Sequence, residues 1–169
     1  MKKIGIFYGS STGVTAKIAR QLATLLNVSQ NDVHDIADIA PSALGEYEII
    51  LLGSSTWGAG EMQKDWMDFS KALEAMDLKG KTVAVFGTGN EKMSVTFCNA
   101  VGRIYDIAAK TGAKMIGEFN SDGYTFRKSL AKIEDSDLMK GLVIDQGNEP
   151  RLTDKRLEEW AKIILKDAE

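Results

Sequence analysis

Lys3-Ile-Gly-Ile-Phe-Tyr-Gly-Ser-Ser-Thr-Gly-Val-Thr15 joins an apolar run to a loop rich in hydroxyl groups, and a helical pattern of apolar residues follows it. The pattern predicts a strand, a loop and then a helix. Backbone N–H groups at the start of a helix lack partners within the helix, and the helix dipole is positive there. This loop therefore suits a phosphate monoester, bound by backbone N–H groups and by the hydroxyls of Ser10, Ser11, Thr12 and Thr15.

The same loop lacks the features of a site that transfers phosphate. Its glycines match neither the Gly-Lys-Ser/Thr ending of a P-loop nor the G-x-G-x-x-G pattern, and no Lys or Arg lies between Tyr8 and Ala16. Phosphoryl transfer normally uses cationic groups and Mg²⁺, so neutral donors favour a resident phosphate that does not react. The alternative is an ordinary helix N-cap, although four hydroxyls exceed what one cap needs.

Composition predicts the class of protein. The 169 residues, 44% of them hydrophobic, suit one domain spanning 1–169. A net charge of −3 argues against a nucleic-acid partner, and the single cysteine, Cys98, excludes an internal disulfide or a cysteine-based metal site. The sequence shows no signal-peptide pattern, and no apolar run approaches the ~20 residues of a membrane span. We expect a cytoplasmic protein without a metal or a membrane partner.

The order of strand, loop and helix recurs along the chain. Apolar runs at 47–52 and 82–86 predict buried strands that end in glycine-containing loops at 53–61 and 87–93, and a weaker strand signal lies at 33–36. A helical pattern follows each of the two loops. Such alternation predicts a doubly wound parallel sheet in a three-layer α/β/α arrangement, with a ligand crevice at the carboxyl ends of the strands.

The last third of the chain is less regular. Strand patterns at 114–119 and 141–145 flank a polar segment, 120–140, that shows no clear period. The last strand is therefore expected to be split by an insertion of about 20 residues, which is longer than an ordinary loop. Thr153 is expected to cap a final amphipathic helix.

Several of these segments together resemble the flavodoxins, specifically the long-chain type, whose last strand carries an insertion. The matching segments are Ser10 to Thr15, Ser55 to Gly60, Gly87 to Asn90, Ser121 to Tyr124 and Gly141 to Asp145. The resemblance covers essentially the whole chain. It implies five strands in the order 2-1-3-4-5 and non-covalently bound FMN. It further implies a low-potential one-electron carrier that uses the flavin semiquinone and hydroquinone and is not an enzyme.

The resemblance also assigns the residues that contact FMN. Trp57 would stack on the inner face of the flavin, and the Gly58–Ala59 peptide would lie beside the flavin N5, where it could flip to offer a carbonyl. The full set lies in three loops: Ser10, Ser11, Thr12, Gly13, Val14 and Thr15; Ser55, Thr56, Trp57, Gly58, Ala59 and Gly60; and Thr88, Gly89, Asn90, Met93 and Phe97.

The sequence departs from the family pattern at two places. Val14 replaces the usual Asn, which removes a side-chain donor but keeps the backbone N–H. The third loop is one residue short, and Met93 lies where the family has a tyrosine over the outer flavin face. Met93 either covers that face through its thioether or leaves it exposed. Asn90 also replaces an acidic residue, and Lys92 adds a positive charge nearby.

Three other functions are alternatives to an electron carrier. A phosphorylation-driven receiver module needs acidic residues where this chain has Ser10 and Ser54. An FMN-dependent quinone or NAD(P)H reductase would need open access to the flavin beside Met93, and a flavin-free interaction domain would be colourless. The expected partners are larger redox proteins in transient complexes with a monomer. The acidic residues Glu61, Asp65 and Asp68 are either a docking patch or a solvated helix face.

Overall fold

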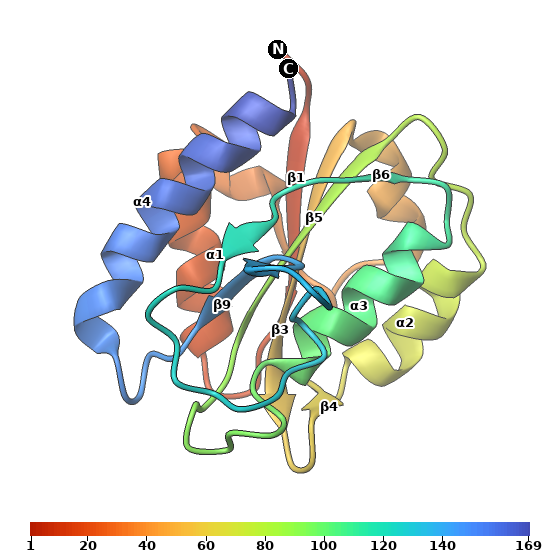
Figure 1. Ribbon diagram of the computed structural model, residues 1–169. Helices are drawn as coiled ribbons and strands as arrows, with labels where there is room; N and C mark the ends of the chain where they lie inside the picture. The colour runs from red at the N-terminus through yellow and green to blue at the C-terminus, as the bar shows by residue number, and fades with distance from the viewer.

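A parallel β-sheet forms the centre of the molecule in this computed structural model, which describes all 169 residues (Figure 1). Its order is β2-β1-β3-β5-β6, and β9 also pairs with β5. The strands are β1 (Ile4–Gly9), β2 (Val33–Asp35), β3 (Ile49–Trp57), β5 (Thr82–Thr88), β6 (Lys114–Met115) and β9 (Leu142–Ile144). The predicted doubly wound order, 2-1-3-4-5, is confirmed.

Two segments share the last position of the sheet. β6 pairs with the start of β5, at Thr82 and Val83, whereas β9 pairs with its end, from Phe86 to Thr88. The predicted split of the last strand is therefore confirmed. The strand expected at 114–119 ends early, because Gly117 has a φ of 83° and turns the chain away from the sheet. The segment between β6 and β9 contains an antiparallel pair, β7 (Phe119–Asn120) with β8 (Leu138–Met139).

Four helices cover the two faces of the sheet. In Figure 1, α1 and α4 lie to the left of the sheet and α2 and α3 to the right. Their bounds are α1 Val14–Leu25, α2 Trp66–Glu74, α3 Asn99–Ala109 and α4 Pro150–Asp167, and two 3₁₀ turns span Gln30–Asp32 and Pro41–Glu46. The two chain ends lie side by side, and Lys2 Nζ donates to the Ala168 carbonyl oxygen at 2.7 Å.

The expected start of the last helix was wrong. Helix α4 begins at Pro150 with Glu149 as its N-cap, so Thr153 lies inside the first turn instead of before it. Proline favours the first helical position because its φ is already fixed and its missing N–H is not needed there. The hydroxyl of Thr153 is buried and donates to Gln146 Oε1 at 2.7 Å. The predicted apolar face is confirmed, with Leu157, Trp160, Ala161 and Ile164 buried.

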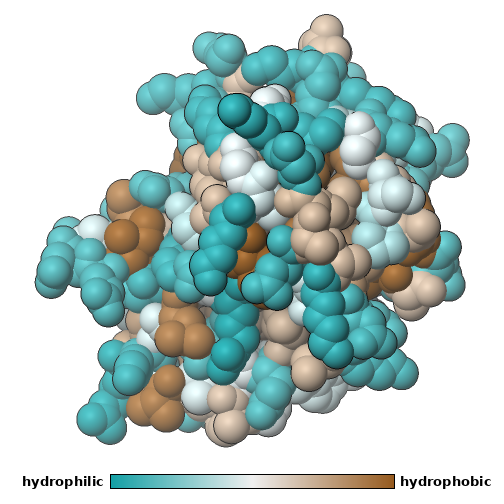
Figure 2. Space-filling model, turned by 90° about the vertical axis from the view of Figure 1, so that its right-hand side faces the viewer, coloured by the Kyte–Doolittle hydropathy of each residue, from teal (hydrophilic) through white to brown (hydrophobic).

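Apolar strand residues form a core between the helix layers. Leu51, Leu52, Val85 and Phe86 are completely buried, as expected for strands that are covered on both faces. The outward side of α2 and α3 faces the viewer in Figure 2, where hydrophilic residues cover most of the surface and hydrophobic ones form small separate patches. No helix has the length and the apolar character that crossing a membrane requires.

Candidate functional site

The first loop of the site is closed by its own residues. Ser10 Oγ accepts a hydrogen bond from the Gly13 N–H at 3.1 Å, and Gly13 adopts a φ of 91°, which suits glycine. Helix α1 begins directly afterwards, and the N–H groups of Val14, Thr15 and Ala16 donate to no group of the protein. The loop therefore presents free backbone donors at the positive end of a twelve-residue helix.

The second loop is shorter than the sequence suggested. A loop was expected from Gly53, but β3 continues to Trp57 because its pairing with β5 extends to Ser55 opposite Thr88. A tight turn then leads into β4 (Glu61–Met62), which runs antiparallel to the end of β3. The Gly60 N–H donates to the Trp57 carbonyl at 3.0 Å to close this turn. The expected loop over 53–61 is thus a strand end and a hairpin.

Trp57 stands at the tip of this hairpin with its ring on the surface. Its indole Nε1 donates to Ser55 Oγ at 2.7 Å, and 43% of the residue is exposed. The turn that follows contains Gly58 and Gly60 with φ values of 51° and 103°. Because a hydrogen bond fixes the indole and almost half of the residue is exposed, Trp57 offers a flat aromatic surface to a ligand.

The third loop leaves the end of β5 beside the first. Thr88 Oγ1 lies 3.2 Å from Thr15 Oγ1, so the two loops meet through their hydroxyls. Asn90 Oδ1 accepts from the Lys92 N–H at 2.9 Å and from Asn148 Nδ2 at 2.8 Å. These contacts fix the start of the loop next to the start of α1.

A cavity of about 300 Å³ lies among the three loops, at the carboxyl ends of the strands. Its lining contains residues of all three predicted groups: Thr12, Val14, Ser55, Thr56, Trp57, Thr88, Gly89 and Asn90. Gln146 and Gly147, which follow β9, complete it and were missed by the sequence analysis. The sequence could have indicated both residues, because they follow the last strand, which also ends at this edge of the sheet.

Two of the predicted contacts lie elsewhere. The side chain of Phe97 is completely buried and stacks on Phe126, with 5.4 Å between ring centroids and 26° between planes. The structure thus places Phe97 in the core beneath the third loop and not at the cavity. Met93 lies on the surface with 53% of the residue exposed, and it does not line the cavity. The other predicted residues outside the lining flank it in the first loop and the hairpin: Ser10, Ser11, Gly13, Thr15, Gly58, Ala59 and Gly60.

Gln63 is a further residue that the sequence analysis did not identify. It is completely buried, its Nε2 donates to Ser11 Oγ at 3.1 Å, and its backbone N–H donates to Ser54 Oγ at the same distance. Gln63 therefore joins the first loop to the strand that carries the second. No local pattern distinguishes this glutamine, because its partners are far away in the sequence.

Comparison with known proteins identifies the family. The fold and the cavity define a doubly wound α/β protein with a ligand site at the carboxyl edge of its sheet. Residues 6–160 match the family model described as Flavodoxin. The chain is 42% identical to a flavodoxin of Klebsiella pneumoniae over 99% of this chain and 95% of that one. It is 43% identical to flavodoxin 1 of Escherichia coli strain K12 over 96% and 93%. This chain belongs to the flavodoxin family.

Solved structures give the same result. Fusobacterium nucleatum flavodoxin bound to flavin mononucleotide superposes with a TM-score of 0.89 at 32% identity, over 99% of each chain. Oxidised flavodoxin 1 of Bacillus cereus superposes with a TM-score of 0.71 at 25% identity, over 96% of this chain and 97% of that one. Flavodoxins are electron-transfer proteins with FMN as their cofactor and are not enzymes. These expectations are confirmed at the level of the family.

Proposed function

We propose that this protein binds FMN non-covalently and carries single electrons between larger redox proteins, using the semiquinone and hydroquinone of the flavin. One observation carries the proposal. A single cavity extends from the start of α1, at Thr12 and Val14, to the exposed indole of Trp57. It therefore offers donors for a phosphate at one end and an aromatic surface for a flat ring system at the other.

The residues at the phosphate end fit a monoester. The free N–H groups of Val14, Thr15 and Ala16 point out of the helix start, and the hydroxyls of Ser10 and Thr12 lie in the same loop. Because Val14 contributes through its backbone, the loss of the family's asparagine side chain leaves these donors in place. Neutral donors and the helix dipole would hold the phosphate without promoting its transfer.

The residues at the other end fit a flavin. Stacking on Trp57 contributes ~0.5–1.5 kcal/mol beyond the burial of area, and Met93 could cover the outer face through its thioether. Gly58 already adopts a positive φ, so a peptide flip beside the flavin N5 would cost little strain. The other assigned contacts in the three loops remain part of this proposal, and the buried Phe97 would support the third loop from the core.

The proposal extends to the partners, the location and the oligomeric state of the protein. Small, transient interfaces near the exposed Trp57 would suit exchange with several redox partners. We further propose a cytoplasmic monomer folded as one domain over 1–169. The single cysteine, Cys98, supports this because it is buried and free of any disulfide.

Reconstitution with FMN tests the proposal. The apoprotein should bind FMN in a one-to-one complex that is yellow and shows stepwise changes in its visible spectrum on reduction. Trp57→Ala should weaken binding by about 2- to 12-fold, the equivalent of the lost stacking, because the flavin keeps its phosphate contacts. Met67→Ala removes a side chain of similar exposure from α2 and should leave binding unchanged.

Two results would contradict the proposal. If the protein did not bind FMN at micromolar concentration, the assignment of FMN as its cofactor would be wrong. Sustained turnover of NAD(P)H and quinone by the purified protein alone would instead show a reductase.

A further inference from the structure

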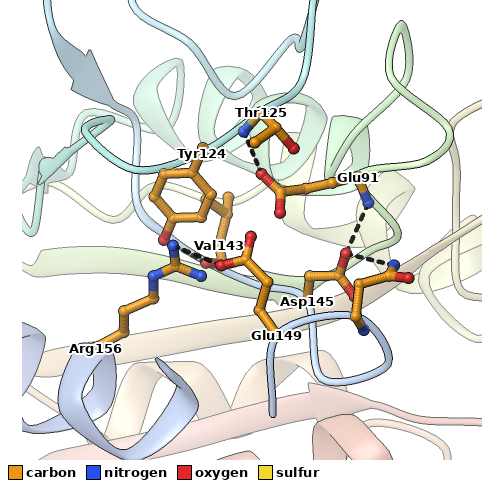
Figure 3. A network of polar contacts seen from close by, with 8 residues as sticks. Glu91, Tyr124, Thr125, Val143, Asp145, Glu149 and Arg156 are labelled. Carbon is orange, nitrogen blue, oxygen red and sulfur yellow. Dashed lines mark hydrogen bonds and ion pairs between the residues drawn. The ribbon is translucent and has the colours of Figure 1, made fainter. Parts of the chain in front are cut away.

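The third loop is held in place by carboxylates from distant parts of the chain, as Figure 3 shows. Only 6% of Glu91, next to Asn90 in this loop, is exposed. Its backbone N–H donates to Asp145 Oδ2 at 2.9 Å, and its Oε1 accepts from the Thr125 N–H at 2.6 Å. Glu91 therefore joins the third loop to the end of β9 and to the insertion at once.

A second carboxyl group faces Glu91. The Glu149 carboxyl points toward that of Glu91 in Figure 3. On its other side, Glu149 Oε2 lies 3.2 Å from Arg156 Nη2. Two carboxyl groups that face each other at a buried place disfavour a second negative charge, so one of them keeps a proton. Because Arg156 stabilises a negative charge on Glu149, the proton belongs on Glu91.

The surroundings leave little freedom for this pair to separate. The Arg156 guanidinium is buried and lies 3.9 Å from the centroid of the Tyr124 ring, and the Tyr124 hydroxyl donates to the Val143 carbonyl at 2.6 Å. Tyr124 belongs to the insertion and Arg156 to α4. The pair thus lies where the third loop, the insertion and α4 meet.

We propose that Glu91 and Glu149 share one proton near neutral pH, and that this proton positions the third loop beside the cavity so that cofactor affinity depends on pH. Glu91 is in this view a positioning residue, since it does not line the cavity itself. The inference rests on the proposed function for the identity of the cofactor. The shared proton can be tested without it.

The charges around the pair support a transition near neutral pH. Burial and the neighbouring Glu149 carboxyl together raise the pKa of Glu91 to about 7, although the hydrogen bond from the Thr125 N–H acts in the opposite direction. The charges of Glu149 and Asp145 also disfavour a second anion. Two other titratable groups lie near Glu91: the Cys98 thiol at the start of α3 and the Tyr124 hydroxyl. Burial raises the pKa of both. The nearby cations are the Arg156 guanidinium and, on the loop itself, the exposed Lys92.

The direction of the effect follows from linkage. The ordinary pKa of a glutamate is 4.5, so the folded protein binds this proton more tightly than the unfolded chain does. The stability that the proton supplies is complete below about pH 4.5 and is lost as the pH rises through about 7. Above that, Glu91 and Glu149 repel each other and loosen the third loop.

The first experiment uses the apoprotein. Carbon NMR of the glutamate carboxyls should show one group that titrates near pH 7 and disappears in Glu91→Gln. The amide of that variant can still accept from Thr125 and donate to Glu149, so it mimics the protonated acid. Its unfolding in urea should therefore vary less with pH than that of the wild type. Glu158→Gln, an exposed change of equal charge on α4, should behave as the wild type does.

The second experiment measures FMN affinity from about pH 5 to about pH 9, across the titration of Glu91. The FMN phosphate itself titrates near about pH 6, so the wild type is compared with Glu91→Gln at each pH. As the pH rises across this range, we expect the wild type to lose roughly threefold more FMN affinity than the variant. This factor corresponds to a pKa of Glu91 about half a unit higher in the FMN complex than in the apoprotein.

The outcomes separate the two proposals. Absence of FMN binding at every pH, with the carboxyl titration intact in the apoprotein, would contradict the proposed function and leave the shared proton standing. The proposal of a shared proton would be overturned if the wild type and Glu91→Gln showed the same pH dependence in unfolding and the same pH dependence in FMN affinity. If Glu91→Gln does not fold, Glu149→Gln provides the test, because losing the neighbouring charge should move the Glu91 titration to lower pH. An unmoved titration would overturn the pairing.

Discussion

The first and third loops border the same cavity but are held in place by different means. In the first loop, a hydrogen bond between residues three apart, Gly13 to Ser10, and the start of α1 fix the backbone. In the third loop, Asn90 has one local partner, Lys92, but the other partners of Asn90 and Glu91 lie 34 to 58 residues away. The backbone of the first loop is thus closed by a local hydrogen bond, with Gln63 adding one contact from a distance, whereas the third loop depends on how the insertion and α4 pack.

The strongest way to disturb the third loop alone is to remove Phe97 beneath it. Phe97→Ala should destabilise the protein by about 3–5 kcal/mol, because the ring is completely buried and stacks on Phe126 of the insertion. Urea denaturation measures this loss. The FMN affinity of the folded fraction should fall as well, since the loop rests on this ring.

An exposed neighbour supplies the control for that experiment. Val95 lies in the same loop and is 53% exposed. We expect Val95→Ala to change the free energy of unfolding by no more than about 0.5 kcal/mol. Equal losses in the two variants would show that the loop as a whole, and not the packing of Phe97 on the insertion, determines stability.

A smaller effect is expected when the first loop is strained through its own backbone. Gly13→Ala places a side chain at a φ of 91°, which costs roughly 1–2 kcal/mol although no atom lies within 4 Å of the new Cβ. Thermal unfolding should show this loss. FMN affinity should fall too, because the residue immediately precedes the free N–H groups of α1.

Gly45→Ala is the matched control. Gly45 also has open space around its Cβ position but no positive φ, so alanine there should be neutral or stabilising by up to about 1 kcal/mol. If both variants lose the same stability, the left-handed backbone of Gly13 is not what holds the first loop.

The smallest effect concerns the charge of the third loop. Lys92→Glu replaces an exposed cation beside Asn90 with an anion and should lower the more negative midpoint potential of bound FMN by roughly 10–40 mV, as expected for screened surface charges. A redox titration measures the shift. Lys162→Glu is the control, because it makes the same change of charge on α4, outside the third loop. Equal shifts in the two variants would assign the effect to net charge instead of to the loop.

Much of the fold was predictable because its signals are local. Buried strands such as β3 and β5 are continuous apolar runs, and the glycine and hydroxyl loops that follow them lie at one edge of a parallel sheet by topology alone. The errors occurred where pairing or packing overrides a local pattern. β3 runs on to Trp57 because β5 and β4 pair with it, and α4 begins before Thr153 because Pro150 suits the first turn.

By itself, the sequence determined the alternation of strands and helices, the position of the first loop and the aromatic residue of the second. It could do so because each of these depends on residues that are close together in the chain, such as Ser10 and Gly13. Only the tertiary structure decided that Phe97 supports the third loop from the core, that Gln63 joins two loops and that Glu91 faces Glu149. Those contacts join residues that only folding brings together, and burial then gives each of them its energetic weight.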